Sequence, residues 1–242
     1  MNYDGEVGEV LKRWTAVLLA LCVLFGALPA LADEWDEQGW DFGDDGGFEE
    51  EEETVDFRTI GGYDIMTYDA GDFRYQLTED GNNAILVAYR GTDPDVVLPE
   101  TVNDIPVVAV NVGMCQWNAL IETLVIPGCI RTIGTNAFAN CKNLKRVEIR
   151  EGLTSLEICC FGGCELLEEI VFPDSLETIY DCAFANCCTL QEIKFGNHLQ
   201  SIGRQAFVLC GSLSKVTIPG GDSVSIGEMA FDACAADLTI VN

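Results

Sequence analysis

Apolar residues return along the second half of the chain at a nearly fixed step. Each unit has the form L-x-x-I-x-I, with apolar positions separated by polar ones. The strings begin at Ile121, Leu144, Leu167, Leu190, Leu213 and, in a shortened form, Leu238. The first four steps are 23 residues long and the last is 25. This alternation predicts a short strand in every unit, with its apolar side chains facing a core.

The rest of each unit repeats as regularly as the strand. One apolar column consists of Ile133, Leu156, Ile179, Ile202 and Ile226, an aromatic column of Phe138, Phe161, Phe184, Phe207 and Phe231, and a thiol column of Cys141, Cys164, Cys187, Cys210 and Cys234. Proline at 127, 173 and 219 is expected to end the strand, because it has no N–H for the ladder. We expect the A-F-x-x-C segment to form a single helical or 3₁₀ turn that carries Phe into the core.

A period of this length is typical of a solenoid, in which a unit buries its apolar side only by stacking on its neighbours. The fold class predicted is an α/β repeat protein, a right-handed and β-rich solenoid with short helical turns. Its repeats are expected over residues 98–242, as one divergent unit, five full units and one terminal strand. Residues 57–97 are expected to form a small β cap that shields the first coil, since an open end exposes core.

These residues resemble the BspA-type leucine-rich repeat, a class of bacterial surface and secreted proteins. The resemblance covers residues 98–242, and Tyr75, Asp80-Gly81 and Leu98-Pro99 are similar to the hairpin that precedes such repeats. It implies a leucine-rich-repeat solenoid and an extracellular adhesion or interaction protein, without identifying a ligand. The chain departs from the family at Asp104, where glycine is usual, and at Met114-Cys115 in place of Ala-Phe. Because Asp tolerates a left-handed backbone, we expect the turn at Asn103-Asp104 to be kept.

The N-terminal part of the chain has a different composition. Lys12 and Arg13 precede an apolar run and a small-residue cleavage pattern ending at Ala32, which predicts a secretory signal peptide over residues 1–32. An uncleaved membrane anchor is the alternative, and it is the only membrane contact expected. Residues 33–56 carry thirteen acidic and no basic residues, out of a net charge of −27. This segment is expected to be disordered, the alternative being an arm for calcium or a cationic partner.

The twelve cysteines suggest a disulfide framework in a secreted protein, but five of them belong to the repeat column. Stacked repeats lie roughly 4.8 Å apart, which is compatible with a disulfide between adjacent units. Cys159 and Cys182 occupy the same repeat position and form the candidate pair. The sequence contains no C-x-x-C and one histidine, His198, so no metal site or cofactor is expected.

No catalytic site is expected either. His198 is the only candidate base for a nucleophilic triad, and it lies in a variable turn position. A basic patch for nucleic acid is absent from the sequence. The leading hypothesis is a secreted or cell-surface module that binds an extracellular or host protein. A structural envelope-associated repeat protein without a ligand is the alternative, and an extracellular polymer-degrading enzyme comes third. The oligomeric state stays open.

Polar positions on the repeated strands predict where such a protein would bind. Solenoids present their strand surface as a continuous array, and here its chemistry is mixed in charge rather than aromatic, which favours a protein over a sugar. The predicted binding residues form three columns: Glu122, Lys145, Glu168, Gln191 and Ser214; Thr123, Arg146, Glu169, Glu192 and Lys215; and Val125, Glu148, Val171, Lys194 and Thr217.

Overall fold

The computed structural model describes residues 66–241, which belong to one compact unit, Ile65–Asn242. Several expectations therefore lie outside the described residues: the signal peptide, the acidic segment and residues 57–65 of the predicted cap. Within the described part, no helix is long and apolar enough to cross a membrane.

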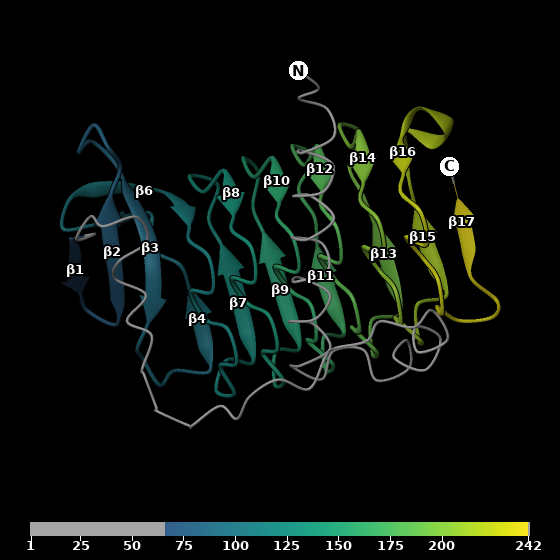
Figure 1. The fold of residues 1–242 in the computed structure, drawn as a ribbon, viewed down its shortest axis with the longest axis horizontal. Helices are drawn as coiled ribbons and strands as arrows, with labels where there is room; N and C mark the ends of the chain where they lie inside the picture. The colour runs from purple at the N-terminus through teal and green to yellow at the C-terminus, as the bar shows by residue number, and fades with distance from the viewer. Residues whose placement is uncertain (1–65, 242) are drawn as a thin grey trace, which may run out of the picture. The chain divides into compact units, whose positions relative to one another are not determined.

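Two rows of parallel strands run along this unit, one strand of each row per coil (Figure 1). The first row, which we name the long-strand face, consists of β4 (Asp95–Val97), β7 (Thr123–Ile126), β9 (Arg146–Ile149), β11 (Glu169–Val171), β13 (Glu192–Lys194), β15 (Lys215–Thr217) and β17 (Thr239–Val241). The second row, the short-strand face, consists of β6 (Ile105–Val110), β8 (Thr132–Ile133), β10 (Ser155–Leu156), β12 (Thr178–Ile179), β14 (Ser201–Ile202) and β16 (Ser225–Ile226). The predicted β-solenoid is therefore confirmed for the described residues.

An antiparallel meander precedes the coils. It consists of β1 (Thr67–Ala70), β2 (Phe73–Leu77) and β3 (Ala84–Tyr89), and β3 pairs in parallel with β6. Tyr75, Ala84 and Leu86 of the meander are buried and join the core of the repeats. The first long strand, β4, begins at Asp95, three residues before the predicted boundary of the repeats.

The hairpin between β5 (Thr101–Val102) and β6 confirms the turn expected at Asn103-Asp104. Both turn residues have a left-handed backbone, with φ of 48° and 65°. Two consecutive left-handed residues form the turn whose twist matches that of paired antiparallel strands. Asp104 thus replaces the usual glycine without loss of the turn.

The core is built from the predicted columns. In the long strands from β4 to β15 the inward side chains are buried, as are Leu124 and Ile126 of β7, whereas β17 is exposed throughout. The five phenylalanines of the aromatic column stack almost parallel through the coils, with adjacent ring centroids 5.1–5.4 Å apart. Each coil therefore covers the apolar side of the previous one, which is how a solenoid buries residues that one unit cannot bury alone.

The helical turns expected at A-F-x-x-C are not found in the described residues. The N–H groups there alternate: Phe138 donates to the carbonyl of Cys160 in the next coil, whereas Ala139 donates to Asn136 three residues back. Asn136 and Asn140 have left-handed φ values of 55° and 57°. A helix would use every N–H within the segment, so the competition from the neighbouring coil selects a row of turns. The described part contains a single 3₁₀ helix, η2 (Gly221–Ser223).

The last repeat step is shorter in the structure than the sequence predicts. Val216 of β15 pairs with Ile240 of β17, a step of 24 residues rather than 25. Ser201 of β14 likewise pairs with Ser225 of β16. The turn that contains η2 absorbs the extra residue before β16, so pairing of the strands, rather than the position of Leu238, sets the register.

Candidate functional site

The predicted binding residues all lie on the long-strand face. Two of the three columns are outward positions of β7, β9, β11, β13 and β15, and the third column immediately precedes each strand. Their side chains alternate with buried ones, as in β9, where Arg146 and Glu148 are exposed while Val147 and Ile149 are buried. The structure thus brings together, on one surface, residues up to 95 positions apart in the chain.

Opposite charges stand beside each other across this face. Among the described residues three ion pairs join neighbouring long strands or the residues just before them: Lys145–Glu122 at 2.7 Å, Arg146–Glu169 at 3.0 Å, and Lys215–Glu192. Glu122 raises the pKa of Lys145 by a hydrogen bond and by its charge, and the charge of Glu168 adds to the shift. Lys145 thus lies beside both carboxylates, with Glu122 as its hydrogen-bonded partner.

The structure also adds residues that the sequence reasoning missed. Asp95 and Val97 of β4 extend the long-strand face by one strand, and Asp95 accepts a hydrogen bond from the Thr123 hydroxyl at 2.6 Å. Val97 and Val171 are apolar yet 58% and 48% exposed, so the face is not purely polar. The signal that could have found β4 is the alternation Asp95-Val-Val97-Leu98, which lacks the L-x-x-I spacing of the other units.

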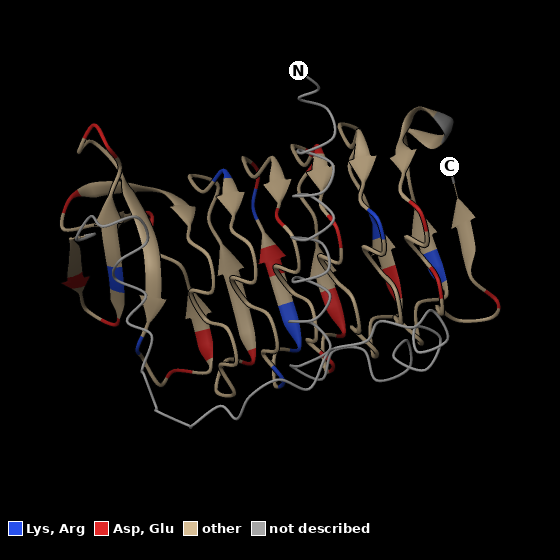
Figure 2. Ribbon diagram, in the orientation of Figure 1, with Lys and Arg blue, Asp and Glu red and all other residues tan. Residues whose placement is uncertain are grey.

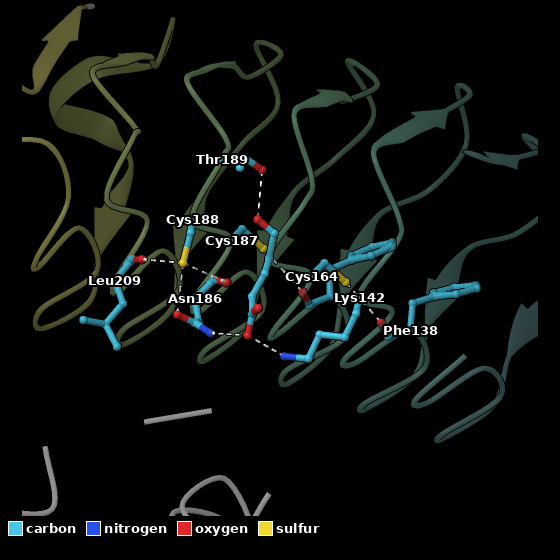
Figure 3. Close-up of polar contacts among 10 residues, drawn as sticks. Phe138, Lys142, Cys164, Asn186, Cys187, Cys188, Thr189 and Leu209 are labelled. Carbon is cyan, nitrogen blue, oxygen red and sulfur yellow. Dashed lines mark hydrogen bonds and ion pairs between the residues drawn. The ribbon is translucent and has the colours of Figure 1, made fainter. Parts of the chain in front are cut away.

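The thiol column forms a hydrogen-bonded ladder inside the coils. Each thiol donates to a backbone carbonyl of the preceding coil: Cys141 to Cys115, Cys164 to Phe138, Cys187 to Phe161, Cys210 to Phe184 and Cys234 to Phe207, over 3.2–3.4 Å. Figure 3 shows this contact for Cys164. Burial raises the pKa of Cys164 and Cys187 well above the ordinary value, so these thiols stay protonated. Their role is structural: each thiol adds a second donor to a carbonyl that already accepts a backbone N–H, as the Phe161 carbonyl does from Cys164.

The disulfide suggested between Cys159 and Cys182 is not present, because both residues are thiols in the structure. The Cys182 sulfur lies 4.0 Å from the side-chain oxygen of Gln205, in the coil beyond it. Both cysteines have a left-handed backbone, with φ of 53° and 55°. A shared repeat position is therefore not sufficient for a disulfide, which also requires a specific Cβ geometry.

A second polar network lies beside the thiol column (Figure 3). Glu165 forms an ion pair with Lys142 at 2.5 Å and accepts a hydrogen bond from Asn186 at 3.5 Å. The exposed thiol of Cys188 donates to the Asn186 side-chain oxygen at 3.2 Å. Partial burial raises the pKa of Cys188, and the charge of Glu165 adds to the effect. A raised pKa lowers the fraction of thiolate, which is the nucleophilic form of cysteine, so these influences do not activate the Cys188 thiol.

His198 lies in the turn after β13, with 67% of its side chain exposed. Its Nδ1 atom is 3.0 Å from the Asp174 carbonyl oxygen and 3.3 Å from the Asp174 carboxylate. Asp174 in turn accepts a hydrogen bond from the Asn197 N–H, so this cluster links turns of neighbouring coils. Within residues 66–241 no three histidine, cysteine or acidic side chains are grouped so as to hold a metal ion.

The short-strand face carries a second column that the sequence reasoning did not single out. It consists of hydroxyl side chains in paired positions: Thr132, Ser155, Thr178, Ser201 and Ser225. Ser155 lies 3.4 Å from the Thr132 hydroxyl, and Ser201 lies equally far from that of Thr178. The signal in the sequence is a Ser or Thr immediately before each Ile or Leu of the first apolar column. Hydroxyls that contact one another in this way hold the register of the short strands.

Comparisons with known proteins agree with this architecture. The family model described as the BspA type leucine rich repeat region matches residues 113–237 in six copies. A leucine rich cell surface protein from Faecalibacterium prausnitzii A2-165 is 28% identical, with a TM-score of 0.62 over 73% of this chain and 50% of that chain. The T. pallidum leucine rich repeat protein is 30% identical, with a TM-score of 0.60 over 68% of this chain and 82% of that chain. A leucine-rich repeat protein from Bacteroides ovatus ATCC 8483 is 27% identical, with a TM-score of 0.62 over 72% and 46%.

This chain therefore spans about half the length of the F. prausnitzii and B. ovatus proteins. No protein of curated function is similar enough to match. The family match covers more than half of the sequence and includes all strands from β7 to β16. The chain belongs to the BspA-type leucine-rich repeat family.

Proposed function

We propose that this protein is a non-catalytic interaction module, secreted or held at the cell surface, whose long-strand face binds an extracellular protein. The observation that carries the proposal is the row of seven long strands, a four-stranded sheet followed by a three-stranded one, with exposed side chains of both charges. A surface of this kind discriminates between partners by charge complementarity, which affects the rate and specificity of association. The exposed Val97 and Val171 add apolar contact area between the charges.

The extracellular location is supported by two separate observations. The sequence predicts a signal peptide over residues 1–32, and the similar F. prausnitzii protein is described as a cell surface protein. We further propose that the β1–β3 meander caps the first coil, since its buried residues join the core of the repeats. A cap leaves the two strand faces, rather than the end of the stack, as the accessible surface.

Binding of the secreted form, residues 33–242, to immobilised matrix and plasma proteins tests the proposal. We expect saturable binding that is kept when residues 33–56 are removed and at two salt concentrations. The double substitution Arg146→Ala with Glu169→Ala is expected to weaken it at least tenfold, because it removes one ion pair from the centre of the face.

The matched control is Arg204→Ala with Glu177→Ala, which removes one charge of each sign outside the long-strand face. Both double variants are expected to keep the unfolding midpoint of the wild type, since isolated surface pairs contribute little to stability. Binding that is lost equally in both variants, or the absence of any saturable binding, would favour the structural envelope protein. Turnover of an extracellular polymer would instead show that the protein is an enzyme.

A further inference from the structure

We infer that the long-strand face binds the same face of a second copy of this chain. The two copies would be related by a two-fold axis parallel to the strands, passing between β9 and β11. This inference rests on the proposed function, because it names a partner for the same surface. Such an axis places β9 over β11 of the partner subunit, β7 over β13 and β4 over β15, and every contact occurs twice.

The charges along this face follow an order that suits such an axis. Lys145 and Arg146, at the start of β9, are basic, whereas Glu168 and Glu169, at the start of β11, are acidic. Farther out, β4 contributes Asp95 and β15 contributes Lys215. Figure 2 shows the blue segment of β9 beside the red segment of β11, with β4 red and β15 blue. These side chains are about half exposed or more, for example Arg146 at 66% and Glu169 at 58%.

The two-fold axis opposes these charges pair by pair. Lys145 faces Glu168 of the partner subunit, Arg146 faces Glu169 of the partner subunit, and Asp95 faces Lys215 of the partner subunit. The remaining opposed positions are Glu122 with Gln191, Thr123 with Glu192, Val125 with Lys194, Glu148 with Val171, and Val97 with Thr217. Three kinds of opposite-charge contact are thus made, and no like charges meet at these positions.

Neighbouring positions of the axis do not give this agreement. An axis on β9 places Arg146 over Arg146 of the partner subunit, and an axis on β11 places Glu169 over its own copy. An axis between β11 and β13 places Glu169 over Glu192 of the partner subunit. Like charges opposed at an interface disfavour a complex strongly, so the pattern selects one register.

Arg146 and Glu169 already form an ion pair within one chain. In the dimer this pair lies over the same pair of the partner subunit with the two residues exchanged, so the four charges form a square of alternating sign. Exclusion of water from this square strengthens each attraction, because the local dielectric falls. The net charge of −27 opposes the approach of two copies when little salt is present. At about 0.15 M salt, where the screening length is about 8 Å, the distant repulsion is reduced while contact pairs persist.

Sedimentation equilibrium of the secreted form, residues 33–242, tests the inference. We expect a reversible monomer–dimer equilibrium in about 0.15 M salt, with weaker association both in about 0.01 M and in about 1 M salt. Arg146→Glu is expected to weaken the dimer at least tenfold, because one substitution creates two repulsive contacts. The double variant Arg146→Glu with Glu169→Arg restores opposed charges and is expected to recover the dimer.

Arg204→Glu is the matched control, since it makes the same charge change in the turn after β14 and is expected to leave the dimer unchanged. A protein that is monomeric at every concentration measured overturns the inference. Dimers that Arg204→Glu weakens as much as Arg146→Glu, or larger assemblies instead of dimers, also overturn it. A protein that stays monomeric but binds a matrix protein through Arg146 and Glu169 overturns this inference and leaves the proposed function in place. A dimer that the charge exchange rescues supports the inference whether or not another partner is found.

Discussion

The thiol of Cys187 donates a hydrogen bond to the carbonyl oxygen of Phe161, 3.4 Å away in the preceding coil. The same contact recurs along the thiol column, so the position requires a side chain that is small, largely apolar and able to donate one hydrogen bond. Cysteine meets all three requirements. The high cysteine content of this chain is therefore in large part a property of the coil interior.

Replacing Cys187 by alanine is expected to lower the free energy of unfolding by about 1–3 kcal/mol. The substitution removes one of the two donors to the Phe161 carbonyl, which also accepts from the Cys164 N–H, and opens a small cavity in a fully buried place. Cys188→Ala, one residue away and exposed, is the control and is expected to change stability by no more than ~0.5 kcal/mol. Urea unfolding measures both values, and equal midpoints for the two variants would contradict the role assigned to the column.

Gly163→Ala is expected to destabilise the protein by about 1–3 kcal/mol, because Gly163 has a left-handed backbone with φ of 74°. An added Cβ would also lie 2.4 Å from the side-chain oxygen of Asn140, which is buried. At Gly211 an added Cβ meets nothing within 4 Å, so Gly211→Ala is expected to be neutral or slightly stabilising. The midpoint temperatures of thermal unfolding of the two variants test this prediction. A Gly163→Ala protein as stable as Gly211→Ala would show that position 163 does not require glycine.

The carboxyl group of Asp80 is expected to titrate far below its ordinary pKa of 3.8. Hydrogen bonds from the Thr78 hydroxyl and from the side chain and N–H of Asn82 lower its pKa to about 2. A lowered folded-state pKa means that the ionised form stabilises this turn above about pH 4, and that the contribution is lost as the pH falls through 2. Thr78→Val should move the titration midpoint upward toward 3.8, as measured by NMR of the side-chain carboxyl. Thr101→Val, an exposed site on β5, should leave it unchanged, and an unmoved midpoint in Thr78→Val would rule out the hydroxyl as the main cause.

Much of the candidate site could be predicted, because residues at the same position of successive repeats lie side by side in the structure. Once Arg146 and Glu169 are known to be equivalent residues of successive units, their neighbourhood follows from stacking. The strand β4 was missed for the converse reason. Asp95-Val-Val97 lies 28 residues before its partner Thr123 and lacks the repeated spacing, so only its pairing with β7 identifies it.

The turns between the strands were not predictable in the same way. A segment such as Ala137-Phe138-Ala139 is compatible with a helical turn when considered alone. In the structure the Phe138 N–H bonds to the next coil, and this non-local bond selects a row of turns with left-handed residues. Repeat position likewise suggested a Cys159–Cys182 disulfide, whereas both residues are thiols in the structure.

The sequence by itself determined the columns of the core and the side chains that reach the long-strand face from β7 to β15, because both depend on periodicity. The tertiary structure decided the course of the turns, the hydrogen-bond partners of the thiols and the place of β4 beside β7 on the long-strand face. Those features depend on which backbone groups of neighbouring coils meet, and that is settled when the coils stack.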